Sequence, residues 1–158
     1  MNESKESLGA AVAKIPSGCS ILTVDDNGRR TGVLVSWIQQ ASFDPLRITV
    51  CVKHGRPVGG LIDAAKRFLI NIVGEDANPL FQHFGKGFSL EEDAFAGIEF
   101  EESAFGPLLA DGIAHLGCGV VQRIDAGDHD IYLADVLAAR AQEASKPYVH
   151  LRKSGFSY

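Results

Sequence analysis

The pattern of hydrophobic and polar positions along this chain has mostly the two-residue period of a β-strand. In the stretch 32–45, Val33, Val35 and Trp37 alternate with Leu34, Ser36 and Ile38, and both sets are largely apolar, which is typical of a strand packed between two layers. Ser36 interrupts the apolar run, and Gln39, Gln40 and Ser42 follow where the strand is expected to end. A buried hydroxyl or amide without a partner costs about 1–3 kcal/mol. Either the fold or a ligand therefore supplies a partner, unless this is an ordinary strand that runs into a polar turn.

The strand pattern continues on both sides of this stretch. Asn27-Gly28 is a strong signal for a two-stranded hairpin, so residues 19–24 should pair with the strand that begins at Gly32. Further strands are expected at residues 46–53, 67–73, 98–102, 114–124, 129–140 and 147–152. About six to eight strands, most of them joined by hairpins, predict a mainly β fold: an antiparallel barrel, closed or nearly closed, with peripheral helices.

Three segments have helical spacing. The first is capped by Ser4 or Ser7 and places Leu8, Val12 and Ile15 on one face. The others are expected at about residues 58–65 and 79–85.

The loop before the second helix carries several basic groups. Pro57 suits the first helical turn, where its missing N–H is not needed. The N–H groups and the positive dipole end of such a helix form an anion site, and Lys53, His54 and Arg56 are close to it in sequence. A solvated basic turn is the alternative interpretation.

Composition narrows the class of protein. The chain has 158 residues, 46% of them hydrophobic, and a net charge of −5, which predicts a single globular domain over residues 1–158. The acidic balance and the lack of a basic stripe argue against nucleic-acid binding. No apolar run reaches the length of a membrane span, and residues 1–14 do not resemble a signal peptide, so we expect a cytoplasmic protein without membrane contact.

Few residues carry recognisable chemistry. Cys19, Cys51 and Cys118 lie far apart without zinc spacing, so we expect buried small hydrophobic groups and no metal site. Asp128-His129 opens a long predicted strand, where the carboxylate can orient the imidazole at the mouth of a pocket. A turn aspartate beside a satisfied ring is the alternative. Together these features suit a flat, partly apolar ligand with a phosphate, such as flavin mononucleotide (FMN).

Much of the chain resembles the flavin reductase-like family, the FMN-binding split barrels. It is more closely similar to the flavin reductase module at the C-terminus of some flavodiiron proteins. The matching runs are IPSGCSILT (15–23), LVSWIQQASFDP (34–45), ITVCVKHGRP (48–57), RFLINIV (67–73), HFGKGF (83–88), DAFAGIEF (93–100), AGDHDIYLADV (126–136) and VHLRKSGFSY (149–158). They cover nearly the whole chain in the order of the family.

The resemblance implies an antiparallel split β-barrel that forms a homodimer, with FMN bound near the subunit interface. It implies flavin contacts from Leu34, Val35, Ser36, Trp37, Gln39, Gln40, Ala41 and Ser42, phosphate-side contacts from Lys53, His54, Arg56 and Pro57, and further contacts from Phe84 and Tyr158. Gly127-Asp128-His129 matches a motif associated with nicotinamide use, which makes Asp128 and His129 the candidate catalytic residues.

The sequence departs from the family in places, and three functions remain open. Trp37 and Gln40 stand where many stand-alone reductases carry small hydroxyl residues, although flavodiiron-type sequences share this bulkier pattern. Phe156 and Ser157 replace a polar residue and a histidine of the flavodiiron module. The expected function is an NAD(P)H-dependent flavin reductase that passes electrons to a partner acceptor. The alternatives are an FMN electron carrier without its own NAD(P)H activity, and a haem or F420 binder.

Overall fold

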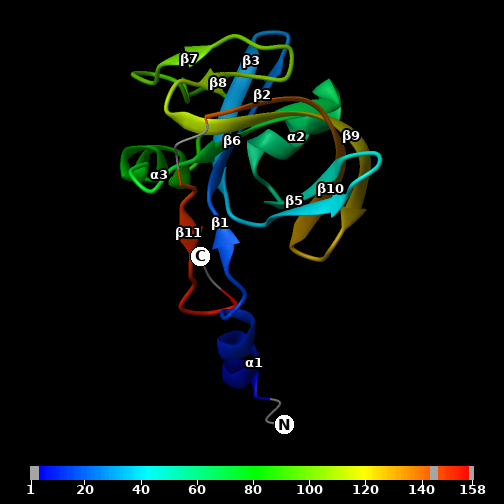
Figure 1. Ribbon diagram of the computed structural model, residues 1–158, viewed down its shortest axis with the longest axis vertical. Helices are drawn as coiled ribbons and strands as arrows, with labels where there is room; N and C mark the ends of the chain where they lie inside the picture. Colours follow the sequence, from blue (N-terminus) through cyan, green and yellow to red (C-terminus); the bar gives the residue numbers. More distant parts are fainter. Residues whose placement is uncertain (1–3, 143–145, 157–158) are drawn as a thin grey trace.

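The computed structural model describes residues 4–142 and 146–156. It confirms the predicted mainly β architecture (Figure 1). The helices are α1 (Lys5–Val12), α2 (Pro57–Ala65) and α3 (Asn78–Gly85). The strands are β1 (Ser17–Gly18), β2 (Ser20–Asp26), β3 (Arg29–Val35), β4 (Ile38–Ser42), β5 (Arg47–Lys53), β6 (Arg67–Val73), β7 (Phe100–Glu101), β8 (Leu108–Leu109), β9 (Gly112–Asp125), β10 (His129–Ala141) and β11 (Val149–His150).

One antiparallel sheet of seven strands forms the body of the molecule, in the order β3-β2-β6-β9-β10-β5-β4. The predicted hairpin at Asn27-Gly28 is confirmed: both residues have positive φ, 54° and 85°, as a tight turn between paired strands requires. The two edge strands, β3 and β4, are consecutive in the chain. The sheet therefore curls round on itself, and β3 approaches β5 at the seam (Figure 1).

The prediction of one continuous strand after Gly32 was wrong in its extent. The strand ends at Val35, which is opposite Ser20, and β4 begins at Ile38, which pairs with Val50 on the far edge of the sheet. Ser36 and Trp37 lie between these two strands and connect the edges of the barrel. Apart from Ser36, the apolar pattern continues across this connection to Ile38, so the periodicity gave no sign of the change of partner.

The hydrophobic core consists of two clusters, one inside the barrel and one on its outer face. Inside the barrel, the alternate residues Ile48, Val50 and Val52 of β5 are all buried. Helix α2 packs on β2 and β3 and adds Val58, Leu61 and Ile62 to this cluster. The second cluster lies under α3 and the segment that follows it, and it includes Phe84, Phe88 and Phe95.

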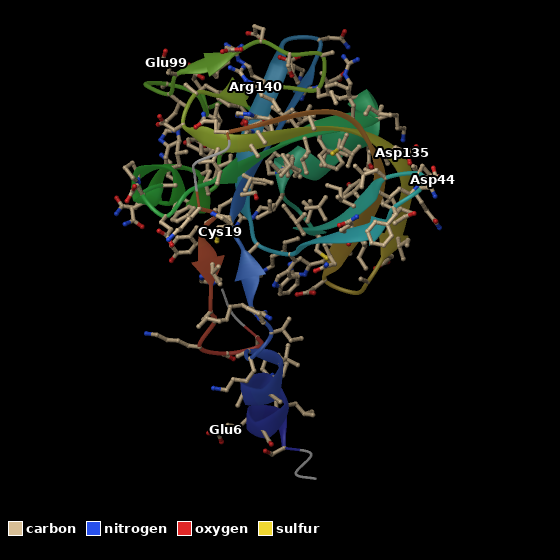
Figure 2. All side chains as sticks on the ribbon, viewed as in Figure 1. Glu6, Cys19, Asp44, Glu99, Asp135 and Arg140 are labelled. Carbon is tan, nitrogen blue, oxygen red and sulfur yellow. The ribbon has the colours of Figure 1, made fainter. Side chains whose placement is uncertain are left out.

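The N-terminal helix stands away from the barrel, and side chains such as that of Glu6 project clear of it (Figure 2). The helix is confirmed, and the Ser4 side chain caps it by accepting a hydrogen bond from the Ser7 N–H at 3.2 Å. The residues expected on its apolar face are not covered: Leu8 is 52% exposed, Val12 44% and Ile15 62%, and Ile15 lies beyond the helix end.

The C-terminal segment, residues 146–156, runs back alongside β1 and α1. β11 pairs with β1, and the Gly155 N–H donates to the Gly9 carbonyl at 2.8 Å. Val149, Leu151 and Phe156 are exposed there, each by 60% or more. In the described part of the chain, no helix has the length and apolar character needed to span a membrane.

Candidate functional site

A pocket of about 300 Å³ lies at the seam between β3 and β5, where the chain crosses from one sheet edge to the other. Six of the predicted flavin-site residues line it: Leu34, Val35, Ser36, Trp37, Lys53 and Arg56. Cys19, Val33, Cys51, Val52, Phe81, Gly85, Tyr148 and His150 complete the wall. Its volume is at the lower end of the range of about 300–1,000 Å³ that is typical of ligand sites.

The pleat of the sheet explains how distant residues meet here. β5 and β10 are antiparallel, with Lys53 opposite His129 and Val52 opposite Asp130. Lys53 and His129 therefore share one face of the sheet, whereas Val52 and Asp130 share the other. The His129 ring lies against Trp37, with the ring centroids 4.8 Å apart.

Ser36 provides the clearest sign of a ligand-binding site. The residue is only 8% exposed, and its Oγ has no hydrogen-bond partner among the described residues. The fold therefore does not supply the partner that the sequence requires, and the cost of about 1–3 kcal/mol remains. A ligand polar group at this position would remove that cost.

Two basic residues, Lys53 and Arg56, also line the pocket. Arg56 is half-buried and lies beside Gly32 and Val33. Val33 precedes Ser36 by three residues, which is about 10 Å along an extended strand. Within the described residues, neither Arg56 nor Lys53 has an ion pair. The predicted helix start is confirmed, with Arg56 at the N-cap of α2 and Pro57 in its first turn.

Gly87 is a residue of the site that the sequence did not indicate. Its φ is +75°, and a Cβ built there would lie 2.2 Å from Nη1 of Arg56. The guanidinium thus occupies the space that any other residue at this position would fill. Gly87 belongs to the run HFGKGF, but nothing local to that run points to Arg56.

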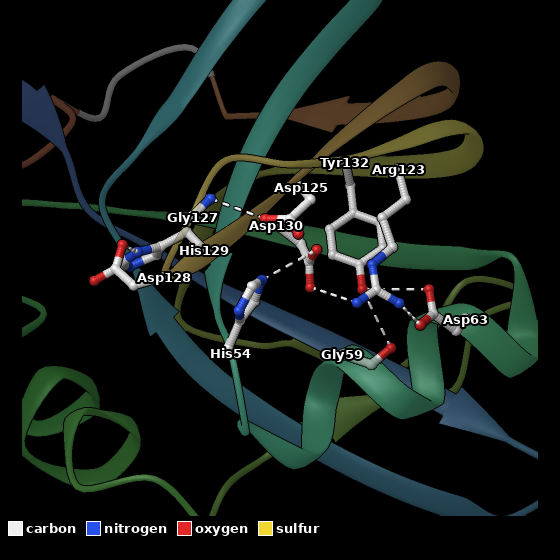
Figure 3. Close-up of polar contacts among 10 residues, drawn as sticks. All are labelled: His54, Gly59, Asp63, Arg123, Asp125, Gly127, Asp128, His129, Asp130 and Tyr132. Carbon is white, nitrogen blue, oxygen red and sulfur yellow. Dashed lines mark hydrogen bonds and ion pairs between the residues drawn. The ribbon is translucent and has the colours of Figure 1, made fainter.

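Asp128 and His129 form the pair that the sequence predicts. Nδ1 of His129 lies 2.7 Å from Oδ1 of Asp128, and the His129 side chain is only 7% exposed (Figure 3). This hydrogen bond lowers the pKa of the Asp128 carboxyl below its ordinary value. The turn before it is held by Gly127, whose N–H donates to Oδ1 of Asp125 at 2.9 Å.

Other predicted site residues lie outside the lining of the pocket. Gln39 lines a neighbouring groove of about 600 Å³, which shares Ser36, Trp37 and Cys51 with the pocket. Gln40 and Ala41 are exposed, and Ser42 is half-buried. His54 and Pro57 lie on either side of Arg56 in the chain and do not line the pocket. Phe84 is fully buried in the outer cluster, and Tyr158 lies outside the described residues.

Several lining residues were missed because they come from distant elements. Phe81 of α3 contacts Tyr148 edge to face, with ring centroids 4.7 Å apart. The Arg152 guanidinium lies 5.0 Å from the centre of the Trp37 ring, so the C-terminal segment closes one side of the connection. A more polar cavity of about 630 Å³, near residues 74–80, contains none of the predicted site residues.

The three cysteines lie in different surroundings. Cys19 and Cys118 are buried as predicted, whereas Cys51 is half-buried in the pocket wall. Burial raises the pKa of the Cys19 thiol to about 11 and that of Cys118 to about 12. Among the described residues, no group of three or more His, Cys, Asp or Glu side chains is placed to hold a metal ion.

Comparison with known proteins agrees with this fold. The family model described as "Flavin reductase like domain" matches residues 12–157, and the chain therefore belongs to the flavin reductase-like family. The family and the split-barrel fold that the sequence predicts are both confirmed.

Two relatives, both named as diflavin flavoproteins, are similar to most of this chain. It is 35% identical over 154 residues to diflavin flavoprotein A 1 of Synechocystis sp., which covers 96% of this chain and 27% of that protein. A related protein of Nostoc sp. is 34% identical over 160 residues, with 97% and 28% covered. The chain thus spans about a quarter of the length of these relatives.

The NADH:FAD oxidoreductase SgcE6 of Streptomyces globisporus has the same fold, with a TM-score of 0.84 at 22% identity over 90% of this chain and 85% of that one. A second structure of that protein, in complex with NAD and FAD fragments, has a TM-score of 0.80 at 22% identity, with 89% and 84% covered.

Proposed function

We propose that this chain is an FMN-binding flavin reductase that transfers hydride from NAD(P)H to flavin and passes the electrons to a partner acceptor. Family membership supports flavin chemistry. The observation that carries the proposal is the buried Ser36 hydroxyl, which has no hydrogen-bond partner among the described residues, in a pocket that also holds Lys53 and Arg56, neither of which has an ion pair within that part of the chain. An isoalloxazine ring with polar edges, joined by a five-carbon chain to a phosphate, has this distribution of apolar, polar and anionic groups.

The residues of the pocket divide the work of holding the flavin. The Ser36 hydroxyl donates to or accepts from a polar edge of the ring, which removes the cost of its burial. Lys53 and Arg56 neutralise the phosphate, and the N-terminus of α2 adds a favourable dipole. The indole of Trp37 and the aliphatic Leu34 and Val35 cover the apolar part of the ring. When bound, the flavin supplies the hydride acceptor.

His129 and Asp128 serve the nicotinamide in this proposal. Neither residue lines the pocket itself, but His129 lies against Trp37, which does, and the Asp128 carboxylate fixes the orientation of the His129 ring. A ring held in this way can position the nicotinamide carboxamide beside the flavin. SgcE6, which shares the fold, binds NAD and FAD fragments in its complex, and this supports a nicotinamide site.

An FMN electron carrier is the second candidate. The relatives named as diflavin flavoproteins are about four times as long as this chain. If electrons reach the flavin of such a module from another part of its protein, the module has no need of its own nicotinamide activity.

We also propose that two copies form a homodimer through α1 and the C-terminal segment. α1 and the C-terminal segment leave large apolar side chains uncovered, including Leu8, Ile15, Leu151 and Phe156. Large apolar side chains exposed together are typical of an interaction surface. Sedimentation equilibrium that gives the mass of a monomer at micromolar concentration would contradict this part of the proposal.

Two measurements test the function. The purified protein should bind FMN when the two are mixed, and its visible spectrum should show the flavin bands. A protein that stays colourless would refute the proposal, and a Soret band would identify a haem binder instead. Anaerobic addition of NADH or NADPH should then bleach the bound flavin, whereas an electron carrier would keep its colour.

The role of His129 is tested in the same assay. His129→Ala should slow the bleaching measured by stopped flow about 10-fold or more, because positioning is lost, while FMN affinity changes less. An unchanged rate would remove His129 from the site.

A further inference from the structure

One buried carboxylate connects three elements behind the phosphate-side loop. Asp130, at the start of β10, is only 6% exposed. It accepts a hydrogen bond from Nη2 of Arg123 at 2.7 Å, and its other oxygen lies 3.3 Å from Nε2 of His54 (Figure 3). Arg123 belongs to β9, and His54 begins the loop that leads to Arg56 and α2.

The same cluster extends to α2 itself. Arg123 also pairs with Asp63 on that helix, and the Tyr132 hydroxyl lies 3.3 Å from both the Gly59 carbonyl and Oδ1 of Asp63 (Figure 3). Tyr132 is fully buried on β10, two residues after Asp130. The loop and the helix after it are therefore attached to one end of the β9–β10 hairpin.

Backbone hydrogen bonds also hold the loop. The His54 N–H donates to the Asp128 carbonyl at 3.0 Å, the Arg56 N–H to the Lys53 carbonyl at 3.3 Å, and the Gly59 N–H to the Arg56 carbonyl at 3.0 Å. Gly55 has a φ of +78° and nothing within 4 Å of its Cβ position, so packing at that residue does not restrain the loop. Side-chain contacts with the hairpin are thus an important restraint on where Arg56 lies.

Asp130 does not itself face the proposed flavin. It lies on the opposite side of β10 from His129, in register with the interior residue Val52. A carboxylate would also repel a phosphate. Arg123 lowers the pKa of Asp130, so the group is ionised at neutral pH and attracts the basic side chains around it.

We infer that Asp130 is the positioning residue of the phosphate-side loop: through His54 and Arg123 it holds the segment from Lys53 to Pro57 where Arg56 can reach the flavin phosphate. The inference rests on the proposed flavin site. It predicts that removal of the Asp130 charge weakens binding of the flavin phosphate and leaves binding of the ring unchanged.

The test compares FMN with riboflavin, which has the same ring and no phosphate. Asp130→Asn keeps the size of the side chain and removes its charge. Titrations followed by flavin fluorescence should show that the FMN dissociation constant rises about tenfold, equivalent to about 1.4 kcal/mol. The riboflavin constant should change by less than about twofold, because the ring contacts are retained. Equal losses for both ligands, or no loss, would overturn the inference.

Asp135→Asn is the matched control. Asp135 lies on the same strand, opposite Arg47 of β5, and its carboxylate pairs with Arg47 at 2.7 Å. This variant also breaks one aspartate–arginine pair of β10, so it should lose a similar contact without changing the ratio of the two flavin affinities. If the ratio of FMN affinity to riboflavin affinity falls equally in both variants, the effect of charge is general, and a specific role for Asp130 is contradicted.

Amide hydrogen exchange tests the same role without any flavin. Asp130→Asn should speed exchange of the His54 and Gly59 amides about tenfold and leave β6 unchanged. Unchanged exchange at those two amides would overturn the positioning role. If the wild-type chain binds neither flavin, the proposed function fails, yet this measurement still decides whether Asp130 holds the loop.

His54→Ala serves as a second variant if Asp130→Asn does not fold. The His54 side chain is 39% exposed, and its removal breaks one contact of Asp130 while Arg123 remains. The ratio of FMN to riboflavin affinity should then fall about threefold. An unchanged ratio would contradict the inference.

Discussion

Gly87→Ala is the sharpest test of the basic end of the pocket. The new Cβ would lie 2.2 Å from Nη1 of Arg56, whereas ordinary contact begins at 3.4 Å, so the guanidinium must move by about 1.2 Å. Arg56 ends in a flexible side chain and can make this shift. The proposed contact with the flavin phosphate is then lengthened or lost.

Two separate costs follow from this substitution. Gly87 has a φ of +75°, and alanine in that conformation costs about 1–2 kcal/mol of folding free energy. A hydrogen bond to a charged group contributes about 1.5–3 kcal/mol. Because the displaced guanidinium keeps part of its attraction for the phosphate, we expect an FMN dissociation constant about tenfold higher, equivalent to about 1.4 kcal/mol.

Gly97→Ala separates these two costs. Gly97 has nearly the same φ, +76°, but nothing lies within 4 Å of its Cβ position. Urea unfolding should therefore show similar destabilisation in both variants. Fluorescence titration should show weaker FMN binding in Gly87→Ala alone, with riboflavin binding unchanged.

The comparison also defines the result that would refute the reasoning. If Gly87→Ala and Gly97→Ala bind FMN equally tightly, the position of the Arg56 guanidinium does not matter for binding. The phosphate would then have to lie elsewhere, and the basic loop would be a solvated turn.

Three further predictions concern the stability of the flavin-free protein. Ser36→Ala removes an unsatisfied buried hydroxyl, so its free energy of unfolding in urea should be unchanged or rise by about 1 kcal/mol while flavin affinity falls; a less stable variant would contradict this. Gly32→Ala places a Cβ 2.7 Å from the buried Phe84 ring and should lose about 1–3 kcal/mol, whereas Gly60→Ala, with nothing within 4 Å, should not be destabilised. The folded pKa of Asp130 is lowered, so its contribution to stability is present above its unfolded pKa of about 3.9 and is lost as the pH falls further. The difference in urea midpoint between wild type and Asp130→Asn should therefore shrink as the pH falls below about 4, and a constant difference would contradict this.

Much of the fold followed from local chemistry in the sequence. The strand predicted at residues 67–73 is β6 with identical bounds, and the helix predicted at 58–65 is α2 with one more residue. Asn27-Gly28 marked its hairpin because few residue pairs accept positive φ at two consecutive positions. These features depend on neighbours in the chain, so periodicity and turn residues were enough to predict them.

Predictions that depend on distant partners were less successful. Residues 32–45 read as one strand because alternation does not reveal which strand lies alongside. The helix predicted at the N-terminus exists, but its apolar residues are uncovered in the single chain. Periodicity says which face is apolar and does not say what covers it.

The sequence by itself determined the residue types of the candidate site and the segments that carry them: a serine in an apolar run, a basic loop before a helix, and an aspartate–histidine pair at the start of a strand. Only the tertiary structure decided that these meet. The pairing of Lys53 with His129 and the crossing at Ser36 bring them to one seam. That closure depends on hydrogen bonds between strands about 75 residues apart, which no local pattern encodes.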